Sequence, residues 1–303
     1  MSRVQAELVL DARNGTGESP VWDVREQALY WVDIPARRLH RWAPSGATQA
    51  WRAPEMIACI ARRERAADGW VAGLESGIVA VAPQADGTLA TQPLAGVAHA
   101  RSGMRFNDGR CDRQGRFWAG TMALDMAAGH RTGALYRYDA GADQDGTLLP
   151  SRLAGFIVPN GLGFSPDGRT MYLSDSHPTV QTIWAFDYDT ETGTPSNRRV
   201  FVDMNPLPGR PDGAAVDADG GYWICGNDAG LVHRFTPEGR LDRSLAVPVK
   251  KPAMCAFGGP GLDTLFVTSI RPEGIDLSDQ PLAGGVFALR PGVSGLPEPA
   301  CRG

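Results

Sequence analysis

Four side chains that carry a potential oxygen ligand stand at matching places in the sequence: Glu18, Asn107, Asn160 and Asp212. A second polar residue follows each of them five positions later, and an apolar strand begins ten or eleven positions after each. The second residues are Asp23, Asp112, Ser165 and Asp217. If folding brings the first four together, they would be costly to desolvate without a partner, and a bound cation is the natural one.

The spacing of these residues indicates how the chain could bring them together. The units that begin at Asn107, Asn160 and Asp212 start 53 and then 52 residues apart, and short strands fill them. A near-constant period of this size predicts a β-propeller with one blade per repeat. In a propeller the first strand of every blade begins at the central channel, so the opening residues converge on one point.

The remaining strand signals divide the chain into six blades, which we expect to form a single six-bladed β-propeller domain over residues 1–303. Blade two opens near Met56, where the sequence is apolar, and is expected to line the channel without supplying catalytic or ligand residues. Residues 8–10 precede the first repeat and should close the ring by pairing with the blade that holds residues 284–289. The connection over residues 122–132 is longer than a hairpin needs, which is typical of a substrate-contacting loop.

Composition and charge exclude several classes of protein. The formal net charge is −4 and no Lys/Arg run exceeds two residues, so a nucleic-acid partner is not expected. Residues 1–7 lack the apolar run of a signal peptide, and nowhere do 18 apolar residues follow one another, so no membrane association is expected. The five cysteines are scattered, without a Cys-x-x-Cys motif, and are expected to be buried free thiols. A cytoplasmic protein fits these features best.

Several motifs, taken together and in this order, resemble the regucalcin-like sugar lactonases, also called the senescence-marker-protein or gluconolactonase family. The motifs are GESPVW (17–22), RFNDG (105–109), AGTM (119–122), PNG (159–161), RPDG (210–213) and CAFGGP (255–260). The resemblance covers most of the chain, and most of the motifs lie at blade openings.

The resemblance implies a six-bladed propeller that holds one divalent cation and hydrolyses a sugar lactone to the sugar acid. By position, the metal ligands would be Glu18, Asn160 and Asp212, and Asp212 would also be the catalytic general base. Arg105 and Asn107 would contact the substrate. Asp125 stands where the family most often has a glutamate substrate contact, and its shorter side chain bears on which sugar fits.

Carboxylate and amide oxygens suit Ca²⁺, Mg²⁺, Mn²⁺ or Fe²⁺ more than a structural Zn²⁺, although a catalytic Zn²⁺ stays among the candidates. Either Asp212 takes a proton from the attacking water, or it only orients a water that the cation activates, because a bound cation lowers the pKa of a carboxylate. The sequence leaves the particular lactone, the cation and the oligomeric state open.

Two other functions stay open: a related propeller hydrolase for aryl esters or phosphotriesters, and a non-enzymatic calcium-binding or scaffold propeller. No Gly-x-Ser-x-Gly motif supports a serine hydrolase. Arg105 has a second interpretation, a salt bridge with Asp108 or Asp125. Asp108 is expected to bond backbone amides in its own turn, and His177 to lie in a solvated loop.

Overall fold

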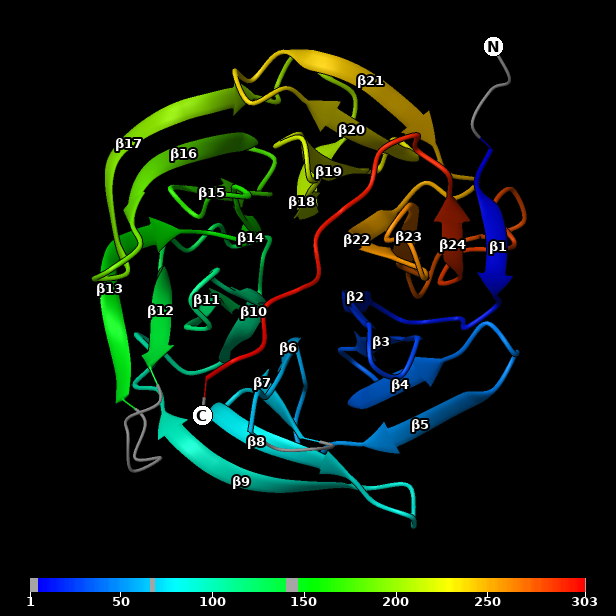
Figure 1. The fold of residues 1–303 in the computed structure, drawn as a ribbon, viewed down its shortest axis with the longest axis horizontal. Coiled ribbons are helices and arrows are strands. Elements are labelled where there is room, and N and C mark those ends of the chain that lie inside the picture. Colours follow the sequence, from blue (N-terminus) through cyan, green and yellow to red (C-terminus); the bar gives the residue numbers. More distant parts are fainter. Residues whose placement is uncertain (1–4, 66–68, 140–146, 303) are drawn as a thin grey trace.

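The computed structural model describes residues 5–65, 69–139 and 147–302. These residues form 24 strands in six four-stranded sheets, which surround a common axis (Figure 1). The chain is therefore a six-bladed β-propeller, as the sequence repeat predicted. Within the described ranges, no helix is long and apolar enough to cross a membrane.

In blades one to five the chain runs outward from the axis, strand by strand, and blade six borrows its outermost strand from the N-terminus. Blade one comprises β2 (Gly17–Asp23), β3 (Ala28–Asp33), β4 (Arg38–Trp42) and β5 (Thr48–Arg52). Blade two comprises β6 (Cys59–Arg62), β7 (Trp70–Gly73), β8 (Gly77–Pro83) and β9 (Leu89–Gly96). Blade three comprises β10 (Met104–Cys111), β11 (Phe117–Ala123), β12 (Gly133–Asp139) and β13 (Thr147–Phe156). Blade four comprises β14 (Pro159–Phe164), β15 (Thr170–Asp175), β16 (Thr182–Asp189) and β17 (Thr194–Asp203). Blade five comprises β18 (Arg210–Val216), β19 (Tyr222–Asn227), β20 (Leu231–Phe235) and β21 (Leu241–Ala246). Blade six comprises β22 (Pro252–Gly258), β23 (Thr264–Ser269), β24 (Val286–Leu289) and β1 (Glu7–Leu10).

Burial falls from the axis outward. Almost every residue of the six first strands is buried, whereas an outermost strand such as β17 is mostly exposed. The second strand of every blade buries a large aromatic ring, and burial of such rings is a large favourable term in packing blade against blade. These rings belong to Trp31, Trp70, Trp118, Tyr172, Trp223 and Phe266.

A β-bulge interrupts the pairing between first and second strands in five of the six blades, at or directly after the opening residue. The shifts in register lie between Glu18 and Val21, Phe106 and Gly109, Asn160 and Gly163, Pro211 and Ala214, and Pro252 and Cys255. A bulge bends its strand and re-aims the side chains next to it. Over the described part of blade two, β6 pairs with β7 in an unbroken register, and that blade opens on apolar residues.

The N-terminal strand closes the ring. β1 pairs antiparallel with β24, with Glu7 opposite Ala288, Leu8 opposite Phe287 and Leu10 opposite Val286. The backbone nitrogen of Asn14 also donates to the carbonyl oxygen of Gly284 at 2.9 Å. The predicted closure by residues 8–10 is confirmed.

Deleting residues 1–12 should lower the melting temperature by about 5–10 °C, because β24 becomes a free edge and the ring loses its clasp. Differential scanning calorimetry of the truncated protein measures this change. Deleting only residues 1–4, ahead of β1, is the control and should leave the melting temperature unchanged. Unchanged melting of the 1–12 deletion would show that β1 contributes little to closure.

The two faces of the ring differ. The first strands begin together on one face, named here the opening face, where the side chains of Asn107 and Asn160 meet. They end on the far face, where residues 290–302 cross the axis as the red segment of Figure 1. This C-terminal segment bonds the backbones of blades two, three, five and six, through Cys301 to Arg62, Arg302 to Gly115, Ser294 to Ala218 and Gly295 to Leu262.

Candidate active site

Two carboxylates, Glu18 and Asp212, lie buried at the opening face, although they come from blades one and five. Burial raises the pKa of Asp212 to about 7. Burial also raises the pKa of Glu18, and the charge of Asp212 raises it further. The charge of Arg105 lowers the pKa of Glu18 and that of Arg210 lowers the pKa of Asp212, but burial outweighs both, so a further positive charge at the site would favour the ionised carboxylates.

The two opening asparagines are joined and fixed in orientation. Asn107 Nδ2 donates to Asn160 Oδ1 and to the Pro159 carbonyl oxygen, both at 3.0 Å. Asn160 Nδ2 donates to Ser176 Oγ at 2.7 Å. These bonds leave Asn160 Oδ1 with one free lone pair, because an amide oxygen accepts two bonds.

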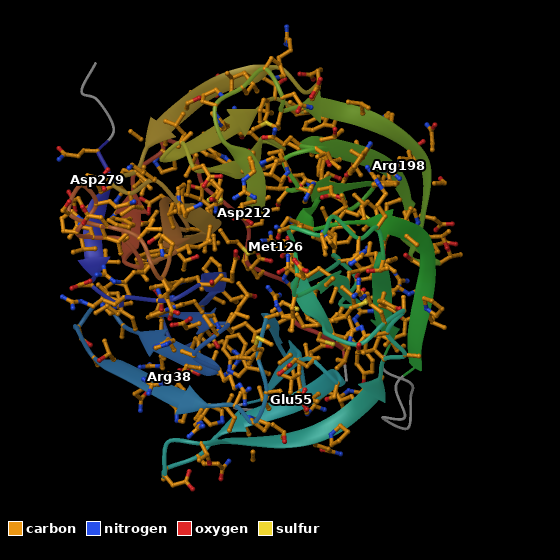
Figure 2. The ribbon with its side chains drawn as sticks, turned by 180° about the vertical axis from the view of Figure 1, so that it is seen from behind. Arg38, Glu55, Met126, Arg198, Asp212 and Asp279 are labelled. Carbon is orange, nitrogen blue, oxygen red and sulfur yellow. The ribbon has the colours of Figure 1, made fainter. Side chains whose placement is uncertain are left out.

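Asp212 is held from the neighbouring strand. Asn227 Nδ2, at the end of β19, donates to Asp212 Oδ2 at 2.6 Å, and Oδ1 accepts no hydrogen bond from the described residues. Arg210, two residues before Asp212, pairs with Asp228 at 2.6 Å, and Lys251 pairs with the same carboxylate. Asp212 therefore has one oxygen anchored and the other open. Figure 2 shows Asp212 beside the axis, whereas Arg198 and Asp279 lie toward the outer edge.

Arg105 lies next to the asparagine pair. Its Nη1 donates to Asn107 Oδ1 at 2.8 Å and to the carbonyl oxygen of Phe106 at 2.7 Å. No ion pair joins Arg105 to Asp108 or Asp125 within the described residues, so the salt-bridge interpretation is not supported. The sequence-predicted residues Glu18, Arg105, Asn107, Asn160 and Asp212 thus gather at one end of the axis.

Asp125 stands apart from that group, in the loop between β11 and β12. Its Oδ1 accepts the Ala128 amide at 3.2 Å, and its side chain is exposed. The loop rises on the opening face, because Ala123 at the end of β11 pairs with Met104 at the start of β10. Met126 of the same loop is 48% exposed and is labelled near the axis in Figure 2.

His177 lies in a loop as expected, whereas Asp108 bonds a different partner from the one expected. Asp108 Oδ2 accepts a backbone amide, but this amide belongs to Leu162 of the next blade, at 2.8 Å, rather than to its own turn. Asp108 therefore ties blade three to blade four. His177 lies in a part-exposed loop with its Nδ1 2.8 Å from Thr179 Oγ1.

Two supporting residues were missed in the sequence, Ser176 and Asn227. Each follows its opening residue by about one hairpin: Ser176 is 16 positions after Asn160, and Asn227 is 15 positions after Asp212. The same repeat phase that located the opening residues could have found both, because the second strand of a hairpin returns to the face where the first began.

The donor set fits one divalent cation. Glu18 and Asp212 supply two carboxylates, and Asn160 supplies an oriented amide oxygen, all hard oxygen donors. The described residues contain no group of three or more His, Cys, Asp and Glu side chains placed to hold a metal ion. Burial raises the pKa of both carboxylates, and the charge of Asp212 raises that of Glu18 further, so a cation held by them would favour their ionised forms.

Fold and site together define the class of protein: a six-bladed β-propeller whose acidic and amide side chains converge at its opening face. The model of the SMP-30/gluconolactonase/LRE-like region matches residues 16–271, so the chain belongs to this family. It is 41% identical to a 6-deoxy-6-sulfogluconolactonase of Pseudomonas putida and 35% identical to a pentonolactonase of Haloferax volcanii, covering 95% and 96% of both chains, respectively. Among solved structures, a calcium-binding protein, regucalcin, from Agrobacterium tumefaciens superimposes with a TM-score of 0.89 at 27% identity over the whole of both chains.

Proposed function

We propose that this protein is a divalent-cation-dependent lactonase that hydrolyses sugar lactones to sugar acids. One observation carries the proposal: Glu18, Asn160 and Asp212, from three different blades, converge at the opening face as an oxygen-donor set. The lactonase names of the two relatives above support the reaction class, and both names specify a sugar-derived lactone.

Glu18, Asn160 and Asp212 would hold the cation, and the cation would supply a Lewis acid that polarises the lactone carbonyl. Asp212 would accept a proton from the attacking water through its open Oδ1, while Asn227 fixes the other oxygen. Arg105 and Asn107 would bind the sugar, because guanidinium and amide donors complement hydroxyl and ring oxygens. Asn107 also links Arg105 to Asn160, so the substrate contacts and the ligand set share one hydrogen-bonded chain.

Hydrolysis of a panel of aldonolactones, followed by acid release at constant pH, tests the proposal. We expect turnover of five- and six-carbon sugar lactones in the presence of Ca²⁺ or Mn²⁺. Activity on aryl esters or phosphotriesters with none on lactones would favour the alternative hydrolase. Cation binding with no hydrolysis of any kind would favour the non-enzymatic calcium-binding propeller.

Asp125→Ala should lower kcat/KM for a hydroxyl-rich lactone by about tenfold, because losing a hydrogen bond to a buried polar partner costs about 1–3 kcal/mol. It should change hydrolysis of γ-butyrolactone much less, since this lactone has no hydroxyl groups. Comparing both substrates on both proteins measures the difference.

A matched control is Asp189→Ala, which also removes an exposed aspartate that accepts turn amides, at the end of β16 in the outer part of blade four. It should alter neither substrate's kinetics. Equal losses on the two substrates with Asp125→Ala would mean that Asp125 supports the loop and does not contact the sugar.

A further inference from the structure

A buried ion pair joins the C-terminal segment to the inside of the ring. Arg110 lies on β10, three residues after Asn107, and its Nη1 is 3.2 Å from Glu298 Oε1. Its Nη2 donates to the carbonyl oxygen of Ala214 on β18 at 2.6 Å. The side chains of Arg110 and Glu298 are only 9% and 21% exposed, so solvent screens this pair weakly.

A third carboxylate, Asp108, lies on β10 between Asn107 at the opening face and Arg110. Its Oδ2 accepts the Leu162 amide, whereas its buried Oδ1 has no hydrogen-bond partner within the described residues. The charge of Asp108 acts on both Glu18 and Asp212, and the charges of Arg110 and Glu298 act on Asp108. The charges therefore alternate from the far face inward: Glu298 negative, Arg110 positive, Asp108 negative.

A cavity of about 230 Å³ separates the C-terminal segment from the first strands, and Arg110 and Glu298 line it. Ser19, the neighbour of Glu18, lines the same cavity. Arg62 and Asp23, which also line it, pair at 2.8 Å. Arg25 lies 3.7 Å from Asp23 and Glu26 lies 3.1 Å from Arg62, so this group of four charges adds no net charge. Charges on the walls of one partly closed cavity are coupled more strongly than charges on the open surface.

We propose that Glu298 is a positioning residue for the cation site and sets its affinity from the far face, through Arg110 and Asp108. This inference rests on the proposed cation site. Glu298 fixes Arg110 and offsets its positive charge. Without that carboxylate, the positive charge of Arg110 is no longer balanced and offsets more of the negative charge of Asp108. The site at Glu18 and Asp212 then has a lower affinity for a cation.

Titration calorimetry of the full-length, metal-free protein with Ca²⁺ and with Mn²⁺ tests the inference without depending on catalysis. Glu298→Gln should weaken the dissociation constant by about three- to tenfold, the range expected when one partly screened charge is removed from a buried line of charges. Glu298→Asp keeps the charge and should bind the cation within about twofold of the wild type. The double variant Arg110→Gln/Glu298→Gln removes both charges and should also return to near wild-type affinity.

Asp263→Asn is the matched control, because Asp263 pairs with Arg290 of the same segment at 2.5 Å, both side chains are exposed, and neither lines the cavity. It should leave the affinity unchanged. Equal affinity in wild type and Glu298→Gln would overturn this inference alone. If the double variant folds and binds the cation as weakly as Glu298→Gln does, the segment has a purely structural role and the inference fails. If the double variant does not fold, Glu298→Asp decides: cation binding as weak as that of Glu298→Gln would also show a purely structural role. No cation binding to the wild type would overturn the proposed site together with this inference.

Discussion

Asp212→Asn is expected to lower kcat for lactone hydrolysis by at least about 100-fold at a saturating cation concentration, the range typical of losing a general base. The substitution keeps one side-chain oxygen in place but removes the negative charge and the proton-accepting carboxylate. It also places an amide where Asn227 donates to Asp212 Oδ2, so the amide nitrogen either meets the Asn227 donor or takes the open position. Either arrangement removes a proton-accepting oxygen from the site.

Single-turnover and steady-state kinetics of the cation-loaded variant measure this effect, and calorimetry shows that the cation is bound. Asp187→Asn is the control, because Asp187 forms an exposed ion pair with Arg199 on blade four, and such pairs contribute little to stability. It should turn over at the wild-type rate. Near-normal kcat in Asp212→Asn would remove Asp212 from the proton transfer and leave it as a ligand only.

Complete removal of divalent cations should abolish hydrolysis, and returning Ca²⁺, Mg²⁺, Mn²⁺, Fe²⁺ or Zn²⁺ should restore it to different degrees. An all-oxygen donor set accepts several hard cations, whose Lewis acidities differ. The same removal should lower the melting temperature, because a ligand at 100 times its dissociation constant stabilises the folded state by about 2.7 kcal/mol.

Dialysis against a chelator, with elemental analysis of the product, provides the metal-free protein for both measurements. Chelator saturated beforehand with Ca²⁺ is the control for direct effects of the chelator and should leave activity intact. Full activity in protein shown to be free of metal would rule out a cation-dependent reaction.

The ring itself could be predicted because its first two strands carry a strong signal. In blades one, three and five the residue five positions after the opening is a buried aspartate: Asp23, Asp112 and Asp217. Each accepts backbone amides of the following turn, for example Gln114 and Arg116 on Asp112. The constant offset of five thus reflects the length of a strand that spans the ring from the opening face to a capped turn.

The outermost strands could not be predicted in the same way. β5, β17 and β21 are largely exposed, so no apolar alternation marks them, and they are strands because the third strand offers a free edge. The bulges could not be predicted from the sequence either, since each depends on the register of the first strand with its partner, β3, β11, β15, β19 or β23. Ser19 and Gly161, with φ of 50° and 61°, adopt the left-handed region there, and only Gly161 is of a type that signals it.

At the site, the gathering of Glu18, Asn107, Asn160 and Asp212 followed from the repeat phase, because equal positions in each blade lie at equal heights on one axis. The partner of Asp108 did not follow, since Leu162 lies 54 residues away on the next blade. The C-terminal segment gave no signal at all. It forms one or two backbone bonds to each of four blades rather than a regular strand, so only the assembled ring defines its path.

Anomalous diffraction from crystals soaked in Mn²⁺ tests most directly whether these residues form a cation site. The expected result is one strong peak at the opening face, about 2.0–2.6 Å from oxygens of Glu18, Asn160 and Asp212, as hard cations lie from such donors. Asp212→Asn crystals soaked identically should show a weaker peak at the same place. A peak elsewhere on the molecule, or none in fully soaked wild-type crystals, would contradict the proposed cation-dependent lactonase.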